Sequence, residues 1–247
     1  MNIFGTNSGL KILDDYRILF MQKTRTNILN KWCDRQWIKF GCVVTGIVCI
    51  AVLWMWNDWS TAIKLLFATG ALIPIHVIEE WVFPGGFHYQ YNIINGSDQP
   101  DRYPMCRLSD MITNLYGTFG FIIMGIVCLT ADHTYNGCLI AALIVCVLEC
   151  IIHTLFGVKM YFRFKSKGKT TLYGPGSITT YLGFLPLGVL YLYELSSTQV
   201  NGMDWAMGLV LAIVMLVGGI LLPENLLKKR DNAYGFRNNG YFDQFLT

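Results

Sequence analysis

Hydrophobic residues along the chain fall into six runs, each of which approaches the length of a membrane span. The runs lie near residues 39–57, 61–83, 111–131, 137–158, 175–195 and 204–222. A helix needs about 20 apolar residues to cross the hydrocarbon core of a bilayer. The pattern therefore predicts an all-α membrane protein, a six-helix transmembrane bundle. No internal repeat and no low-complexity stretch divides the chain, which indicates a single bundle.

The segments that flank the spans are more polar. We expect residues 1–38 to form a cytoplasmic N-terminal segment. Its mixture of basic and apolar residues suits either an amphipathic helix on the inner leaflet or a solvated helix. The segment lacks the apolar stretch and cleavage site of a signal peptide. Residues 39–222 form the predicted six-span transmembrane domain, and residues 223–247 form a cytoplasmic C-terminal tail.

The positions of Lys and Arg predict the orientation of the spans. The outer connections NDWS, ADHTYN and STQVNGMD contain neither residue, whereas the intervening connections are rich in both. Positively charged residues are retained on the cytoplasmic side of a membrane. We therefore expect a multi-pass protein of the cell membrane with both termini in the cytoplasm, and Lys64 is the exception on the outer side.

The composition agrees with a membrane protein and narrows its partners. Hydrophobic residues make up 53% of the chain and charged residues 14%, against roughly 25% charged residues in soluble domains. The formal net charge is +3, and the basic residues lie in patches, which argues against nucleic acid as a partner. The eight cysteines include no CxxC pair and lie mostly in apolar runs, where they suit apolar packing. The lipid bilayer is the expected partner, and no pattern predicts an oligomeric state.

The second and fourth runs contain ionisable residues in their interior. In the stretch IPIHVIEEWVFPGGF, His76 lies three residues before Glu79 and four before Glu80. On a helix, the imidazole therefore shares a face with at least one carboxylate. In the fourth run, Glu149 and His153 are four residues apart and again share a face. Charged groups inside a membrane helix cost roughly 2.5–3.5 kcal/mol each on insertion scales, so several together suggest a function.

The rise of a helix predicts how deep these residues lie. Counted from the cytoplasmic boundary, His76 and Glu149 come out at roughly 12 to 15 Å, and Glu80 and His153 at roughly 6 to 9 Å. If the second and fourth spans are neighbours, each histidine can face a glutamate of the other span. We therefore expect one polar site that is open to the cytoplasmic side.

Imidazole nitrogens and carboxylate oxygens are suitable ligands for a divalent metal ion, with zinc favoured and iron or manganese as alternatives. The candidate ligands are His76, Glu79, Glu80, Glu149 and His153. The candidate catalytic residues are Glu79, Glu80, Asn114 and Tyr173. A glutamate that does not bind the metal is expected to act as general base, while the asparagine and the tyrosine orient the substrate or stabilise an oxyanion.

The leading hypothesis is an intramembrane metal-dependent hydrolase that acts on a lipid-borne or peptide substrate from the cytoplasmic leaflet. Oxidative chemistry at one or two irons is a related alternative. A transporter or proton-coupled carrier uses the same residue types to move protons or cations. In a nonenzymatic membrane partner protein, the His and Glu residues neutralise each other and fix the helix packing.

Four features in order along the chain carry a family resemblance. They are the stretch HVIEEWVFPGGF, Asn114, the pair Glu149 and His153, and the later Tyr173-x-Pro175-Gly176. Together they resemble a family of integral membrane proteins of unassigned function that is named for its His-x-x-Glu-Glu (HXXEE) motif. The resemblance covers the second to fifth spans. It implies a multi-pass membrane protein whose motif residues are catalytic, and it implies no particular substrate or reaction.

Overall fold

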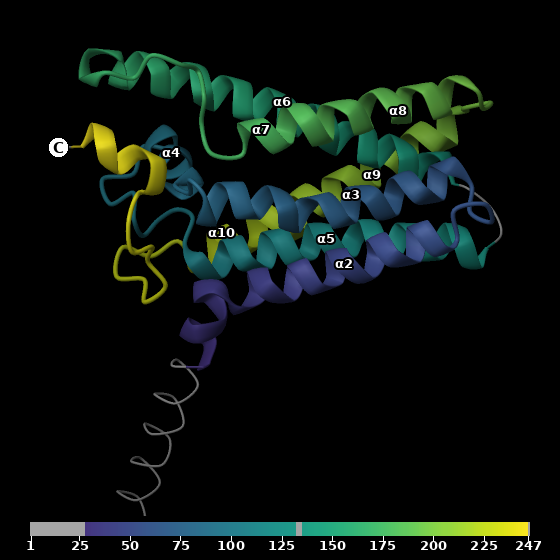
Figure 1. Ribbon diagram of the computed structural model, residues 1–247, viewed down its shortest axis with the longest axis horizontal. Helices are drawn as coiled ribbons and strands as arrows, with labels where there is room; N and C mark the ends of the chain where they lie inside the picture. Colours follow the sequence, from purple (N-terminus) through teal and green to yellow (C-terminus); the bar gives the residue numbers. More distant parts are fainter. Residues whose placement is uncertain (1–27, 132–134, 247) are drawn as a thin grey trace, which may run out of the picture.

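The computed structural model describes residues 28–131 and 135–246, and within these ranges the protein is built from helices without a β-strand (Figure 1). Six helical segments of the described residues are long and apolar enough to cross a membrane. They are Ile28–Trp54, Thr61–Val82, Arg107–Thr130, Asn136–Lys167, Ser177–Ser196 and Gly202–Leu227. The predicted all-α fold with six hydrophobic spans is therefore confirmed.

The first span begins before the predicted residue 39. Its helix continues from Ile28 through the π-helical turn η1 (Trp32–Gln36) into α2 (Trp37–Trp54). Cys33 and Trp37 are buried, so this part of the predicted N-terminal segment packs on the bundle. The remainder of that segment, residues 1–27, lies outside the described residues.

Most of the other spans contain more than one helical element. The second consists of α3 (Thr61–Val77) and the π-helical turn η2 (Ile78–Val82). The third is α5 (Arg107–Thr130), and the fourth is α6 (Asn136–Phe164) with η3 (Lys165–Lys167). The fifth joins α7 (Ser177–Thr179), η4 (Thr180–Phe184) and α8 (Leu185–Ser196). The sixth joins α9 (Gly202–Leu216), η5 (Val217–Leu221) and α10 (Leu222–Leu227), while α4 (Phe87–Ile94) and η6 (Gly240–Phe245) lie outside the spans.

Helix α3 is central to the bundle. It contacts α2 and α5 on one side and α6 and α8 on the other, as Figure 1 shows. The side chains of Leu66, Phe121 and Ile140 are fully buried between these helices. Lipid tails are as apolar as these side chains, so close packing rather than removal from water holds the spans together.

π-Helical turns lie in the first, second, fifth and sixth spans, and such turns often occur at functional sites. In the sixth span, Pro223 has no N–H group to bond the carbonyl of Gly219 four residues earlier. That carbonyl instead accepts a hydrogen bond from Thr113 Oγ1 at 2.7 Å. The irregular turn η5 is thereby connected to α5.

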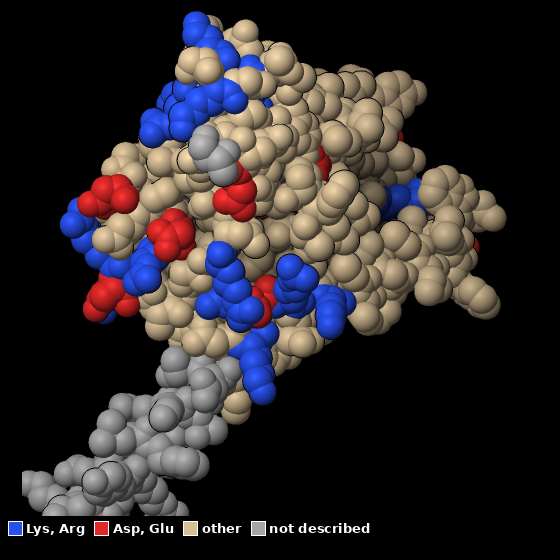
Figure 2. All heavy atoms as spheres, turned by 60° about the vertical axis from the view of Figure 1, so that its left-hand side comes forward, with Lys and Arg blue, Asp and Glu red and all other residues tan. Residues whose placement is uncertain are grey.

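Both described ends of the chain lie at one end of the bundle, together with α4 (Figure 1). Figure 2 shows many Lys and Arg side chains on this end, which we call the basic end. Among the described residues, Lys64 is the basic residue that lies toward the opposite end of the bundle. Its Nζ donates to the carbonyl of Trp56 at 3.0 Å. The two described ends thus lie on the same side of the bundle, and the location of the termini in the cytoplasm stays a prediction.

The segment after α10 folds back against the turn that precedes α4. The backbone N–H of Tyr241 donates to the carbonyl of Gly85 at 2.9 Å. The ring of Phe236 stacks on His88, with centroids 3.7 Å apart. Part of the predicted C-terminal tail is therefore a packed element of the basic end.

Candidate metal centre

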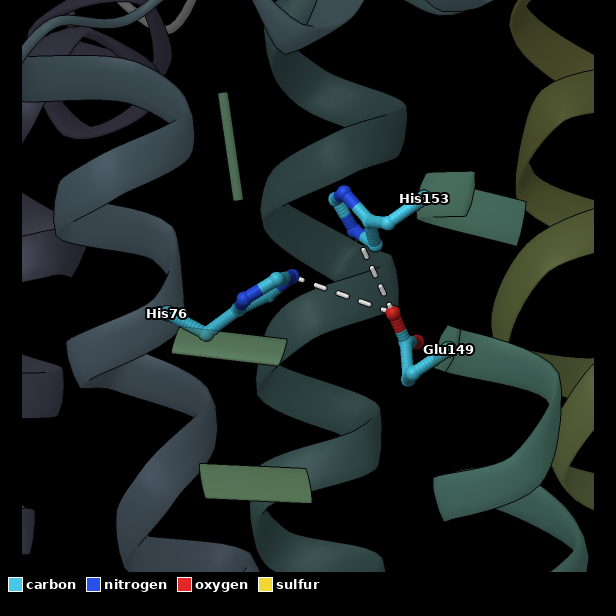
Figure 3. Close-up of side chains that lie close together, drawn as sticks. All are labelled: His76, Glu149 and His153. Atoms are coloured by element: carbon cyan, nitrogen blue, oxygen red, sulfur yellow. Dashed lines mark ion pairs between the residues drawn. The ribbon is translucent and has the colours of Figure 1, made fainter. Parts of the chain in front are cut away.

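Two histidines and two glutamates meet inside the bundle, and we call them the His/Glu cluster. His76 and His153 are buried, and their rings meet edge to face. Both rings point toward Glu149, whose Oε2 lies 3.8 Å from His76 Nε2 and 3.5 Å from His153 Nε2 (Figure 3). Oε1 of Glu80 lies 3.3 and 3.6 Å from the same two nitrogens.

The cluster is built from two helices that are far apart in the sequence. His76 and Glu80 belong to α3 and η2, whereas Glu149 and His153 belong to α6. Each histidine faces the glutamate of the other helix as well as that of its own. These contacts agree with the pairing that the depths in the sequence predict, and α3 and α6 are neighbours.

The cluster has the spacing and the free donor atoms of a metal site. Ligand atoms about 2.0–2.2 Å from a tetrahedral zinc ion lie roughly 3.3–3.6 Å apart, which is close to the distances of 3.5 and 3.8 Å from Glu149 Oε2 to Nε2 of His153 and of His76. Both ring nitrogens of His153 are buried without a hydrogen-bond partner among the described residues, and a bound ion would satisfy Nε2. His76, Glu149 and His153 therefore form a group that can hold a metal ion.

Part of the chain matches a known protein family. Residues 67–191 match the family described as "Protein of unknown function with HXXEE motif". The matched range contains every residue of the His/Glu cluster. The chain belongs to the HXXEE family. No curated protein and no solved structure matches the chain.

The two glutamates of the HXXEE motif have different partners. Glu80 belongs to the cluster, whereas the carboxylate of Glu79 points to the start of the fifth span. Its Oε1 accepts hydrogen bonds from Tyr173 Oη (3.1 Å) and Ile178 N (3.0 Å), and its Oε2 accepts from Thr179 N (2.8 Å) and Oγ1 (2.6 Å). Glu79 therefore caps a helix N-terminus, where negative charge is favourable. Its predicted role as a ligand or base stays a prediction.

Thr179 connects the histidine of the HXXEE motif with its first glutamate. Its Oγ1 lies 2.7 Å from His76 Nδ1 and 2.6 Å from Glu79 Oε2. The hydroxyl carries one hydrogen, and the carboxylate is the stronger acceptor for it. The hydroxyl therefore accepts a hydrogen bond from Nδ1–H of His76. This arrangement leaves the lone pair of Nε2 directed toward Glu80 and Glu149.

The histidine rings are enclosed by backbone and aromatic groups. Gly176 has a φ of +92°, and a Cβ atom at this position would lie 2.2 Å from His153 Cε1 and 2.9 Å from His76 Cε1. Phe184 meets the His76 ring edge-on at 5.3 Å, and the Phe87 ring lies 5.2 Å from that of His153. In the sequence, the GPGS stretch indicates a turn before the fifth span. Neither this stretch nor helical periodicity predicts the contacts of the histidine rings or the hydrogen bonds of Thr179.

The two other candidate catalytic residues lie on different sides of the cluster. Asn114 lines a cavity together with His76 and Glu149, and its Nδ2 donates to Asp110 Oδ1 at 2.8 Å. Tyr173 lies on the side of Glu79 and donates to it. Burial, followed by the nearby Glu79 carboxylate, raises the pKa of Tyr173 and keeps its hydroxyl protonated. Their catalytic roles stay predictions.

Two other residues with metal-binding side chains lie outside the cluster. Burial lowers the pKa of His88 to about 3, so its ring is neutral where it stacks on Phe236. Cys146 is buried in the apolar core, as expected for an apolar packing residue.

Proposed function

We propose that the protein is an intramembrane metal-dependent hydrolase that acts on a lipid-borne or peptide substrate. The observation that carries this proposal is the buried group of His76, Glu149 and His153. Two histidines and one glutamate, with a fourth position left open, form one of the common ligand sets of catalytic zinc. Zinc is the favoured ion, and iron or manganese accept the same ligands.

In this proposal, Glu80 acts as the general base. Its Oε1 lies 3.3 Å from His76 Nε2 and 3.6 Å from His153 Nε2, beside the proposed ligand atoms. A divalent ion held by His76, Glu149 and His153 would supply Lewis-acid chemistry and would make a nearby water more acidic. Glu80 accepts the proton of that water as it attacks and then donates it to the leaving group.

The surroundings of the cluster support an enzyme more than a carrier. A carrier needs polar groups along a route to the opposite side of the membrane. Buried apolar side chains, including Leu66, Leu139 and Ile140, occupy the interior of the spans. The buried pair Thr69 and Tyr191 satisfies its own polar groups through a hydrogen bond of 2.8 Å.

The distribution of charge supports access from the cytoplasmic leaflet of the cell membrane. The basic end carries most of the Lys and Arg side chains of the described residues, which favours a cytoplasmic location. The cluster lies in the half of the bundle nearest this end, because His76 is in the last turn of α3 and Glu80 is in η2. A substrate that enters from the basic end therefore has a shorter route to the His/Glu cluster than one that enters from the opposite end.

Elemental analysis of detergent-purified protein tests the metal site. We expect stoichiometric zinc, iron or manganese in the wild type and its loss in both His76→Ala and His153→Ala, because each variant removes one ligand. Glu194→Gln, which changes a carboxylate near the far end of α8, serves as the control and should retain the metal. Only folded, monodisperse variants are compared. A wild type without metal, after purification without chelators and after addition of each ion, would overturn the proposal.

The same preparations test hydrolysis. Glu80→Gln should retain the metal but lose turnover, because glutamine keeps the shape of glutamate and cannot accept the proton. Products are sought by mass spectrometry after a total membrane extract is incubated with the wild type or the variant. A metal-loaded wild type that leaves both lipids and peptides unchanged would contradict the hydrolase assignment.

Removal of the Thr179 hydroxyl is expected to weaken metal binding without removing a ligand. Outer hydrogen-bond partners of metal ligands typically contribute 10–100-fold to affinity. We therefore expect Thr179→Val to lower the affinity by about tenfold or more, and Thr179→Ser to restore it, since serine keeps the hydroxyl. Competition with a chelator of known affinity provides the measurement. Equal affinity of all three proteins would show that Thr179 does not orient His76.

A further inference from the structure

A mainly apolar cavity of about 90 Å³, which we call the side chamber, lies beside the His/Glu cluster between α5, α6 and the sixth span. Its apolar wall includes Val145, Leu148, Ile152, Phe184, Met215 and Ile220. His76 and Glu149 also line it. The chamber therefore brings an apolar space next to the proposed ligands.

Glu149 is the most accessible member of the cluster. Its side chain is 29% exposed, compared with 6% for His76, 5% for Glu80 and 1% for His153. Glu149 lies near the middle of α6, within a span that is long and apolar enough to cross a membrane. The chamber thus gives access to this carboxylate, and it suits a ligand that joins a polar group to an apolar part.

The three other polar side chains of the chamber are already hydrogen-bonded, and one of them is Tyr116, whose Oη donates to the carbonyl of Val214 at 3.4 Å. Thr113 Oγ1 lies within donating distance of the carbonyls of Ser109 (3.0 Å) and Gly219 (2.7 Å). Asn114 Nδ2 donates to the backbone oxygen of Asp110 at 3.0 Å and to its Oδ1 at 2.8 Å. These side chains leave no donor free for the backbone carbonyls of a peptide.

An apolar groove on the outside of the bundle adjoins the chamber. It lies between α5 and α9, has a volume of about 590 Å³, and shares Tyr116 and Met215 with the chamber. Ile123 and Val214 line this groove and are 57% and 49% exposed on spans that face the bilayer. A hydrocarbon chain in the groove therefore adjoins the chamber beside Tyr116.

We propose that the side chamber binds the hydrocarbon chain of a membrane lipid with its polar end at Glu149, an inference that rests on the proposed function and makes the substrate a lipid. Methylene groups need no hydrogen bonds and gain dispersion contacts with the chamber wall. Peptide groups in the same space would lose their hydrogen bonds to water without replacement, which is strongly unfavourable. The chamber thus distinguishes between the two substrate classes that suit the His/Glu cluster.

Photo-crosslinking of the purified protein in detergent tests the proposal. One probe is a phospholipid with a diazirine in its acyl chain, and the other is an apolar peptide with the same diazirine. Mass spectrometry locates the labelled residues. We expect the lipid probe to label Leu148 inside the chamber, and excess unlabelled phospholipid to suppress this labelling. The peptide probe should leave Leu148 unlabelled.

Two valines of α6 provide a matched pair of variants. Val145 lines the chamber, whereas Val147 is 45% exposed on the outer surface. Val145→Phe should lower lipid labelling of Leu148 by about tenfold, because the ring fills part of the chamber and the hydrocarbon chain loses dispersion contacts with its wall. Val147→Phe adds the same ring and should leave the labelling unchanged. Equal labelling in both variants would overturn the proposal.

Metal analysis of the same samples separates this inference from the proposed function. Two results in the metal-loaded wild type would overturn the lipid assignment and leave the metal site intact. One is the absence of suppressible lipid labelling at Leu148, and the other is labelling of Leu148 by the peptide probe. Suppressible lipid labelling in a protein that binds no metal would support the chamber and overturn the metalloenzyme. The wild-type measurements decide these outcomes even if a variant fails to fold.

Discussion

Replacement of Gly176 by alanine is expected to abolish metal binding and to destabilise the protein by about 3–5 kcal/mol, because two unfavourable effects combine. The first is conformational, since alanine rarely adopts the φ of +92° observed at this position. The second is steric, since the new Cβ would lie 2.2 Å from the ring of His153 and 2.9 Å from that of His76. The rings must move, and the spacing of the donor atoms is lost.

Gly168 provides a control that separates these two effects. Its φ is +94°, almost that of Gly176, but no atom lies within 4 Å of a Cβ built at this position. Gly168→Ala should cost only about 1–2 kcal/mol and should retain the metal. Thermal unfolding in detergent and elemental analysis provide the measurements. Similar behaviour of the two variants would contradict the steric role of Gly176.

Replacement of Phe242 by alanine is expected to lower the stability by about 3–5 kcal/mol, the range for large aromatic side chains in a core. Phe242 is fully buried in an apolar cluster with Tyr89 of α4 and Phe164 of α6. This cluster lies at the basic end, outside the most apolar part of the spans, where removal from water contributes to stability. The midpoint of unfolding measures the effect.

Phe162→Ala is the matched control, because the Phe162 side chain is 61% exposed. We expect little change in its unfolding midpoint. The difference between the two variants reports the contribution of the C-terminal segment, since η6 contains Phe242. Equal midpoints would show that this segment is not required for the stability of the basic end.

The sequence is informative about features that depend on regular periodicity. Runs of apolar residues predict the six spans because each helix must satisfy its own backbone and cover its length with apolar side chains. The spacings between His76 and Glu80 and between Glu149 and His153 predict their contacts because residues four apart share a helix face. Matching depths then predict the contacts between the two helices.

Helical spacing does not separate the roles of Glu79 and Glu80. Both lie close to His76 in the sequence, but adjacent residues on a helix point in different directions. The rotation of η2 and its neighbours decides which carboxylate faces the histidines, and Glu79 instead meets Thr179 of the fifth span. Such a contact between distant segments depends on tertiary packing and leaves no periodic signal.

The C-terminal segment is a second feature that periodicity does not reveal. Residues 228–246 contain no long apolar run, and the prediction for them is a tail. Their attachment depends on backbone groups and close approach, as in the hydrogen bond between Tyr241 N and Gly85 O. A Cβ atom on Gly86 would lie 2.3 Å from the carbonyl oxygen of Asn239. Backbone contacts of this kind do not depend on hydrophobic spacing.

The packing of this late segment against an early turn imposes an order on biosynthesis. The ribosome completes the helices that carry His76 and His153 well before it reaches Asn239 and Tyr241, which contact the turn at Gly85 and Gly86. A nascent chain that stops before Asn239 therefore has both histidines but lacks the element that supports the turn. We therefore expect the turn at Gly85 and Gly86 to reach its final packing only after translation has passed this point.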